Sequence, residues 1–453
     1  MNDIKKNLRI IFALFFVMFA SLTAYIIHFE LVVSSQIVNT GLNPRMNMIQ
    51  ENVVRGNIYD TNGNILVEQT NYSRNYIYGS AFAHTIGYTD VGRFGIEDHY
   101  NLYLMNLSNE IFQRINYISV DGNMYGDSLQ LTLDRDLQRF AYEQLGNNIG
   151  SIVVLEPSTG AIRAMVSSPS FNPNTIATEW DHTRIRADSP LFNRATQGGY
   201  PPGSTFKTIT ALLGLKLAPD FTHYCTGSIF INDHRINNFG RIAHGNIDIT
   251  RAFALSCNTF FVALADYIGP YYFQKHASEM FPHINFSLNH SQPQFNFIYE
   301  DGMTMLMQTS IGQGQTLTSP LYLALLAAAV ANDGYMPQPF IVQNVLTYRG
   351  ASRKTFTPEY TKLFDEYYAQ RLTEMMVAVV TTGTGVPAAL TNYQLAGKTG
   401  TAEVDHGDSH GLFIGFAPAN EPRYAIAVVL ENSDGTGPVL PIVRNVLNFA
   451  LSD

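Results

Sequence analysis

The chain has 453 residues, which is enough for a large hydrophobic core and more than one domain. Apolar residues make up 46% of it and charged residues 14%, a composition that excludes a mainly disordered chain. The net charge is −9 and no basic run occurs, so the sequence disfavours nucleic acid as a partner.

The N-terminal segment predicts a membrane anchor. Three basic residues precede an apolar run at residues 10–27, and more apolar residues follow as far as residue 33. One membrane-spanning helix takes about 20 residues. Because the next basic residue is Arg45, we expect residues 1–9 to be a cytoplasmic tail, residues 10–33 the anchor, and the rest extracytoplasmic. The alternative is a cleaved signal peptide, whose apolar core is usually shorter, roughly 7–15 residues.

A small module is predicted to follow the anchor. Residues 34–50 resemble a short stalk, and residues 55–66 predict two strands joined by a turn at Asn62-Gly63. The chain up to about residue 125 is rich in Asn, Tyr and Gly. We therefore expect an irregular α+β pedestal domain over residues 34–128.

A second and larger domain is predicted from residue 129 to residue 453. Residues 129–133 alternate like a half-buried strand, and Asp134 can cap the helix that follows. Two apolar runs, at residues 151–156 and 161–167, flank a Pro-Ser-Thr-Gly segment and predict a β-hairpin.

Later elements complete the predicted α+β fold. The sequence predicts one helix over residues 250–268 and another over residues 321–330, which Ser319 caps. Residues 411–418 and 424–430 predict a hairpin of two buried strands, and a final amphipathic helix follows it. The large domain is thus expected to be an antiparallel sheet covered by helices.

Cys225 and Cys257 are the only cysteines. With no Cys-x-x-Cys motif and no Cys/His cluster along the sequence, a structural zinc site is not expected. We expect two buried free thiols, and a disulfide is the alternative for an extracytoplasmic fold.

The first element that can carry chemistry is Ser204-x-x-Lys207. Residues three apart share a helix face, so the two side chains can meet. A serine hydroxyl needs a neighbour that accepts its proton, and a lysine can do so once burial has made it neutral. The alternative is a solvated lysine at the start of a surface helix.

Two further elements are Ser256-x-Asn258 and a Lys398-Thr399-Gly400-Thr401 segment. The first element places two polar side chains within an apolar helical run, so both need hydrogen-bond partners. The alternative is an ordinary Ser and Asn of the core whose hydrogen bonds are made locally. In the second, Gly400 would let a peptide backbone approach closely, and the lysine and threonines can bind a carboxylate. If this segment is an edge strand, a substrate peptide could pair with it through main-chain hydrogen bonds. The alternative is a polar strand end beside a glycine turn.

The three elements in this order resemble the motifs of the penicillin-binding proteins and class A β-lactamases. Six further segments resemble motifs of the class B penicillin-binding proteins, most closely the short PbpA type; they are RGNIYD at 55–60, HTIGY at 84–88, GIE at 95–97, NRA at 193–195, IGQG at 311–314 and FIGFAP at 413–418. One departure is Leu412, where the family usually has Trp, and it bears on packing near the site more than on chemistry.

The resemblance implies a serine β-lactamase-like fold and a D,D-transpeptidase. Ser204 would attack the penultimate D-alanine of a peptidoglycan stem peptide, with Lys207 as its base. Ser256 would relay a proton to the leaving D-alanine, and Asn258 would hold the donor peptide and Lys207.

The resemblance also assigns the strand residues and the partners. Lys398 would support the proton network and the substrate carboxylate, which Thr399 and Thr401 would also contact. The backbone N–H groups of Ser204 and Thr401 would form the oxyanion hole. The implied partners are a stem-peptide donor, an amine acceptor, β-lactams that acylate Ser204, and a polytopic glycan polymerase of the SEDS type. No metal or organic cofactor is implied.

Three alternatives to a transpeptidase stay open. A β-lactamase needs a water-activating group, and neither the class A Glu-x-x-Leu-Asn motif nor the class D Tyr-Gly-Asn motif occurs. A D,D-carboxypeptidase would share the three motifs but not the RGNIYD segment. A non-catalytic scaffold or β-lactam sensor would be expected to have degenerate motifs.

Overall fold

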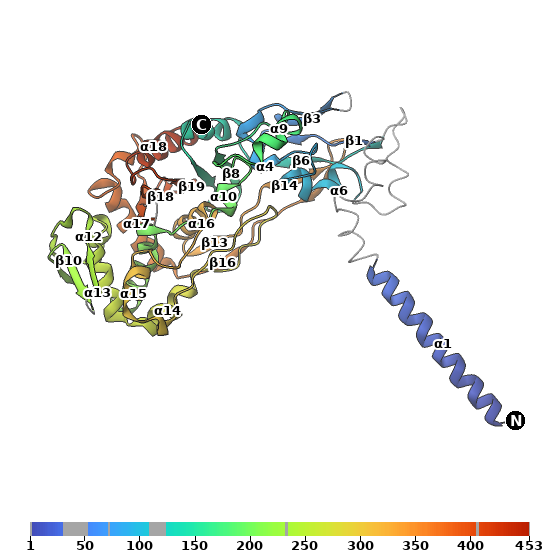
Figure 1. Cartoon of the computed structure of the whole chain (residues 1–453), viewed down its shortest axis with the longest axis horizontal. Coiled ribbons are helices and arrows are strands. Elements are labelled where there is room, and N and C mark those ends of the chain that lie inside the picture. The colour runs from blue at the N-terminus through green and yellow to red at the C-terminus, as the bar shows by residue number, and fades with distance from the viewer. Residues whose placement is uncertain are drawn as a thin grey trace.

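The computed structural model describes residues 2–29, 53–70, 73–107, 124–231, 234–404 and 407–452 (Figure 1). Helix α1 spans Asn2–His28, and it is long and apolar enough to cross a membrane. It fits the predicted single-pass anchor as far as residue 29, whereas the predicted stalk at 34–50 lies outside the described residues.

The centre of the large domain is an antiparallel sheet with the strand order β17-β18-β19-β7-β8. Its strands are β7 (Gly150–Leu155), β8 (Ile162–Ser168), β17 (Ala396–Ala402), β18 (His410–Ala417) and β19 (Tyr424–Leu430). Both predicted hairpins are confirmed, since β7 pairs with β8 and β18 with β19. The strands are continuous apolar runs because helices cover both faces of the sheet.

Alternate side chains of each strand face different helices. Ile152 and Val154 pack in one apolar cluster with helices α8 (Arg135–Leu145) and α18 (Val439–Ala450). Their neighbours Val153 and Leu155 belong to the second cluster, which contains α16 (Pro320–Ala331). Two of these helices begin where the sequence predicts, because Asp134 Oδ1 accepts the N–H groups of Asp136 and Leu137, and Ser319 Oγ accepts the N–H of Tyr322.

A mostly helical lobe packs beside the β17 edge of the sheet (Figure 1). It contains α11 (Lys207–Leu217), β9 (His223–Cys225), β10 (Ser228–Ile231), β11 (His234–Asn237), β12 (Gly245–Ile247), α12 (Ile249–Ala254), α13 (Asn258–Ile268), α14 (Pro270–Ser278), α15 (Gly302–Ser310) and α17 (Glu366–Thr381). Residues 207–215 of α11 are all buried, so this helix runs through the middle of the lobe.

The predicted single helix over residues 250–268 is wrong, because it is broken into α12 and α13. Ser256 lies in the break with φ +53°, a left-handed conformation that a non-glycine residue rarely adopts. The N–H of Cys257 donates to Ala252 O at 2.9 Å, and the N–H of Ser256 donates to Phe253 O at 3.1 Å. These bonds close the end of α12 as a Schellman-type turn does, but without the glycine that usually marks one.

The N-terminal module contributes to a second sheet, of order β15-β14-β6-β2-β3-β4. Its strands are β2 (Ile58–Tyr59), β3 (Ile65–Thr70), β4 (Ser73–Tyr76), β6 (Ser128–Leu131), β14 (Val342–Leu346) and β15 (Ser352–Thr355). The turn at Asn62-Gly63 joins β2 to β3, as predicted. The predicted domain boundary between residues 128 and 129 falls inside β6, and it stays a prediction.

The remaining described elements are short. They are β1 (Val53–Val54), α4 (Ala83–Ile86), α5 (Ile96–His99), α6 (Asn101–Leu104), β5 (Met124–Tyr125), α9 (Ile176–Thr183), α10 (Arg194–Gln197), β13 (Tyr335–Pro337) and β16 (Tyr360–Lys362), with single 3₁₀ turns between some of them.

A buried ionic network holds the N-terminal module together. Arg55 Nε donates to Glu97 Oε2 at 2.6 Å, and Arg74 Nε donates to Glu97 Oε1 at 2.7 Å. Arg55 also donates to Asn101 Oδ1 at 2.6 Å. Burial alone would raise the pKa of Glu97, yet the two guanidinium groups together hold it below its ordinary value. The carboxylate is therefore ionised and fully paired inside the module.

Candidate active site

Ser204 lies on a tight turn that is pressed against the edge strand β17. The turn begins with two prolines and continues as the 3₁₀ helix Gly203–Phe206, which leads directly into α11. Gly203 has φ +50°, and a Cβ there would come within 2.3 Å of Thr401 O. Its N–H donates to Gly312 O at 2.9 Å. Only glycine fits this position, because any side chain would collide with the backbone of β17. Gly203 therefore allows the turn that carries Ser204 to lie against the strand.

Lys207 is fully buried and lies at the centre of the three motifs. Its Nζ is 3.0 Å from Ser204 Oγ, as the three-residue spacing predicts. It is also 2.8 Å from Ser256 O, 3.2 Å from Ser256 Oγ and 2.6 Å from Asn258 Oδ1. The first two motifs therefore meet at one amine.

The partners of Lys207 decide which way its lone pair faces. Ser256 O and Asn258 Oδ1 can only accept, so they take two N–H groups of the amine. The amide of Asn258 is oriented by its own Nδ2, which donates to Asn237 O at 2.8 Å. A neutral amine has two N–H groups and one lone pair, so the lone pair is left for the two nearby hydroxyls, Ser204 Oγ at 3.0 Å and Ser256 Oγ at 3.2 Å.

Burial makes the neutral form of Lys207 accessible. Loss of solvation lowers the pKa of this amine to about 7, against a smaller opposing effect of Cys257. At neutral pH a large fraction of Lys207 is therefore unprotonated and can accept a proton.

Lys398 extends the network on the other side of Ser256. Its Nζ is 2.9 Å from Ser256 Oγ and donates to Thr399 O at 3.1 Å. The side chain is fully buried, and burial, with a further contribution from Lys207, lowers its pKa well below the ordinary value. Polar contacts thus run without a gap from Ser204 through Lys207 and Ser256 to Lys398.

β17 is an edge strand of the sheet, which is the condition that the sequence argument sets for a substrate peptide to pair with it. A Cβ at Gly400 would come within 2.7 Å of Thr205 Cγ2, so this glycine allows the nucleophile turn to approach the strand. Thr401 is exposed, whereas Thr399 is buried and its hydroxyl lies 2.5 Å from that of Thr384. The two predicted substrate-binding threonines are therefore not equally accessible.

Two residues that hold this site have no role predicted from the sequence. Thr384 lies in the loop after α17, where its N–H donates to Ala254 O at 3.2 Å and its hydroxyl contacts Thr399. Asn237, at the end of β11, orients Asn258. Thr384 belongs to a TTGTG run at residues 381–385. The glycines of this run predict a loop, but nothing in it predicts that the loop contacts the other motifs. No local signal marks Asn237.

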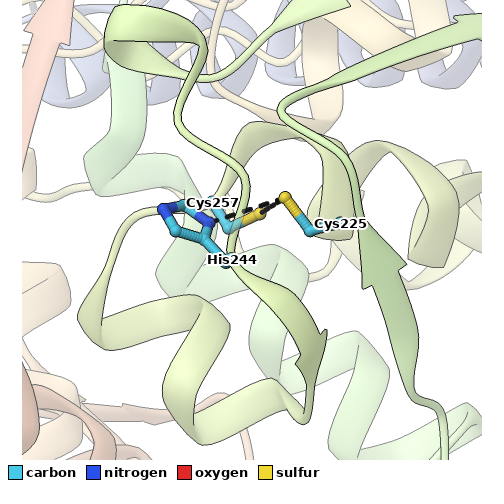
Figure 2. Close-up of side chains that lie close together, drawn as sticks. All are labelled: Cys225, His244 and Cys257. Atoms are coloured by element: carbon cyan, nitrogen blue, oxygen red, sulfur yellow. Dashed lines mark hydrogen bonds between the residues drawn. The ribbon is translucent and has the colours of Figure 1, made fainter.

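Cys225, His244 and Cys257 form a cluster behind the Ser256–Asn258 segment. Figure 2 shows the three side chains pointing toward one another, and their ligand atoms all lie within 4.8 Å of one another. Both cysteines are free and buried, as we expect from the sequence. The cluster is spatial and leaves no motif along the sequence: pairing of β9 with β12 brings Cys225 beside His244, and Cys257 reaches them from the break between α12 and α13. Thiol and imidazole groups are the ligands that zinc prefers.

Comparison with known proteins shows which family the chain resembles. A family model described as the penicillin binding protein transpeptidase domain matches residues 150–448. The peptidoglycan D,D-transpeptidase PbpA of Mycolicibacterium smegmatis is 32% identical over 425 residues, which cover 84% of this chain and 85% of the relative. The peptidoglycan D,D-transpeptidase MrdA of Acinetobacter baumannii is 30% identical over 464 residues, which cover 84% of this chain but only 66% of MrdA.

Solved structures show the same similarity. Penicillin-binding protein A from M. tuberculosis, in an imipenem acyl-enzyme complex, has a TM-score of 0.82 at 27% identity and covers 89% of this chain and 100% of that one. The D,D-transpeptidase domain of a peptidoglycan glycosyltransferase from Eggerthella lenta has a TM-score of 0.80 at 28% identity and covers 88% and 98%. With the matched family model and the converging motifs, these similarities establish that the chain belongs to the class B penicillin-binding proteins.

Proposed function

We propose that this chain is a membrane-anchored peptidoglycan D,D-transpeptidase that cross-links stem peptides through an acyl-enzyme on Ser204. The observation that carries the proposal is the unbroken set of contacts from Ser204 through Lys207 and Ser256 to Lys398, beside an open edge strand. The names of the relatives and the β-lactam acyl-enzyme complexes of similar structures support it.

In the first step, Ser204 Oγ attacks the carbonyl carbon of the penultimate D-alanine of the donor peptide. Its proton passes to the lone pair of neutral Lys207. The carbonyl oxygen becomes an oxyanion, which the N–H groups of Ser204 and Thr401 stabilise. Each donor of this kind contributes roughly 10²–10³ in rate.

In the second step, the peptide C–N bond breaks and the terminal D-alanine leaves. The proton held by Lys207 reaches the leaving amine through Ser256 Oγ, and Lys398 holds that hydroxyl from its other side. An amine of a second stem peptide then attacks the acyl carbon, its excess proton returns through Lys207, and the Ser204 hydroxyl is restored.

The edge strand β17 supplies the binding surface. The donor peptide pairs with its free edge through main-chain hydrogen bonds, and Gly400 leaves room for the turn that carries Ser204. Exposed Thr401, together with Lys398, contacts the terminal carboxylate of the substrate. Thr399 acts mainly through its bond to Thr384, which fixes the strand.

The catalytic domain works outside the cytoplasm, next to a membrane partner. This orientation is supported by the basic residues that precede α1 and by the lack of another until Arg45. A SEDS-type glycan polymerase is the partner that would supply fresh strands, with α1 and the N-terminal module as its docking surface.

A penicillin adduct tests the assignment directly. The full chain in detergent is incubated with penicillin G, and mass spectrometry then locates the adduct and follows its lifetime. We expect one adduct, on Ser204, that persists for longer than minutes, and none on Ser204→Ala. An adduct on another residue would contradict the site, and release within seconds would indicate a hydrolase.

The acylation rate is expected to rise with pH. Only neutral Lys207 can accept the Ser204 proton, and its pKa is about 7. The rate constant should therefore increase about tenfold per pH unit below that value and level off above it. Stopped-flow acylation by a fluorescent penicillin measures the profile, and thermal unfolding at each pH shows that the chain stays folded. A flat profile from pH 5 to pH 9 would argue against Lys207 as the base.

A further inference from the structure

Glu431 follows β19 at the end of the five-stranded sheet and contacts the segment that carries the nucleophile. Its Oε1 accepts the hydroxyl of Tyr200 at 2.7 Å and Nε of Arg194 at 2.9 Å, and both donor residues are buried. We propose that Glu431 is a positioning residue that sets the separation between the N–H groups of Ser204 and Thr401, the two oxyanion donors. This inference rests on the proposed function and adds to it a residue outside the three motifs.

The two oxyanion donors belong to different parts of the fold. Ser204 lies on the nucleophile turn, residues 200–206, whereas Thr401 lies on β17 of the sheet. The separation of their N–H groups therefore depends on how the nucleophile turn is held against the sheet. A misplacement of about 1 Å in a catalytic constellation can lower the rate by about 10². Contacts that dock the turn on the sheet thus bear directly on the rate of acylation.

Backbone hydrogen bonds hold the nucleophile turn to another part of the chain, the loop between α15 and α16. The N–H of Tyr200 donates to Thr318 O at 2.9 Å, and the N–H of Thr318 donates to Tyr200 O at 2.9 Å. The N–H of Gly203 donates to Gly312 O at 2.9 Å. Among the residues that the structure describes, the bond from Tyr200 to Glu431 is the only hydrogen bond between the nucleophile turn and the strands of the sheet or the residues that adjoin them.

The side chain of Tyr200 reaches the sheet beside β17. Its ring meets the ring of His410 edge-on, with the centroids 5.8 Å apart. His410 pairs with Ala402 across β17 and β18, so this contact lies at the end of β17 that contains Thr401. A buried hydroxyl needs a hydrogen-bond partner, and Glu431 supplies the acceptor for Tyr200 at this end of the sheet.

Arg194 fixes the carboxylate of Glu431. Its Nη1 and Nη2 donate to the backbone oxygens of Ser189 at 3.2 Å and Asp188 at 2.9 Å, which leaves Nε for the carboxylate. The side chain of Arg194 is only 6% exposed, so its charge needs a partner. Both donors to Glu431 use the same oxygen, Oε1. The amide oxygen of a glutamine at this position can therefore accept both.

Stopped-flow acylation of the full chain in detergent tests the positioning role. Saturation with a fluorescent penicillin gives both the dissociation constant of the non-covalent complex and the first-order acylation constant. Glu431→Ala is expected to lower the acylation constant by about 10–100-fold with little change in the dissociation constant. Glu431→Gln should stay close to the wild type. An unchanged acylation constant in Glu431→Ala would overturn the proposal, and so would a Glu431→Gln variant as slow as Glu431→Ala.

Glu156 provides a matched control on the same sheet. It follows β7 at the opposite end of the sheet, where it accepts Nη2 of Arg163 at 2.7 Å and the hydroxyl of Thr159 at 2.9 Å. Its side chain is 26% exposed, against 21% for Glu431. Glu156→Ala thus removes an equivalent pair of bonds away from the nucleophile turn, and it should acylate at close to the wild-type rate. An equal loss in both variants would overturn the positioning role.

Tyr200→Phe keeps the test decisive if Glu431→Ala does not fold. It removes one hydroxyl and leaves the ring and the ion pair of Glu431 in place. We expect an acylation constant about tenfold below the wild type. The pH at which the rate is half-maximal should not shift, because the surroundings of Lys207 are unchanged. A folded Tyr200→Phe that acylates at the wild-type rate would overturn the proposal.

The wild type separates this proposal from the proposed function. If wild-type protein forms no penicillin adduct on Ser204, the proposed function fails. If the wild type acylates normally and the Glu431 and Tyr200 variants acylate equally fast, only the positioning role fails.

Discussion

Replacing Lys207 by Met is expected to lower the rate constant of penicillin acylation by about 10²–10⁴. Methionine has a similar length and no charge, so it suits a fully buried position, but it cannot accept the proton of Ser204. It also removes the donors for Ser256 O and Asn258 Oδ1. The measurement is the second-order rate constant with a fluorescent penicillin, with Ser204→Ala as the zero baseline.

Two controls make this result specific. Lys216→Met changes the other lysine of α11, and it should acylate at close to the wild-type rate. Lys207→Arg keeps a positive charge but cannot become neutral, so it should be as slow as Lys207→Met. Partial rescue by arginine would show that residue 207 acts through its charge and not as a base.

Replacing Glu97 by Ala is expected to lower the free energy of unfolding by about 3–5 kcal/mol. The change leaves the guanidinium groups of Arg55 and Arg74 buried without their shared carboxylate. Breaking a buried ion pair from one side costs this much because the remaining charge is neither solvated nor paired. Urea unfolding followed by circular dichroism measures the difference, and partial unfolding of the N-terminal module would appear as a separate early transition.

An exposed ion pair serves as the control. Asp181 on α9 and Arg184, the residue that follows the helix, form a pair at 3.0 Å that is open to solvent. Asp181→Ala should therefore change the free energy of unfolding by less than about 1 kcal/mol. If Glu97→Ala also changed the free energy of unfolding by less than about 1 kcal/mol, the buried ionic network would not be what stabilises the N-terminal module.

Local patterns predicted much of the fold. Asp134 and Ser319 cap helices where the sequence places them, and the two buried hairpins form β7–β8 and β18–β19. These features depend on neighbours in sequence, so a short window contains the information. The meeting of Ser204 and Lys207 was predictable for the same reason, since both belong to one turn of backbone.

Other features could not be predicted because their causes are tertiary. The helix break at Ser256 has no glycine or proline to announce it, and its strained backbone is held by contacts with Lys207 and with residues preceding it in α12. The Thr384–Thr399 contact and the Cys225–His244–Cys257 cluster join segments that meet only after folding. Family resemblance linked the three motifs to one predicted site but gave no sign of that cluster.

The shared six-stranded sheet has a mechanical consequence. β14 and β15 come from residues 342–355 and extend the sheet that β2, β3 and β4 of the N-terminal module begin, with β6 between the two groups. A load applied to the module from the membrane side would be carried as shear across rows of hydrogen bonds, not through a pliable linker. The N-terminal module and the catalytic domain should therefore move as one rigid body, so that a displacement of the module also displaces the catalytic domain.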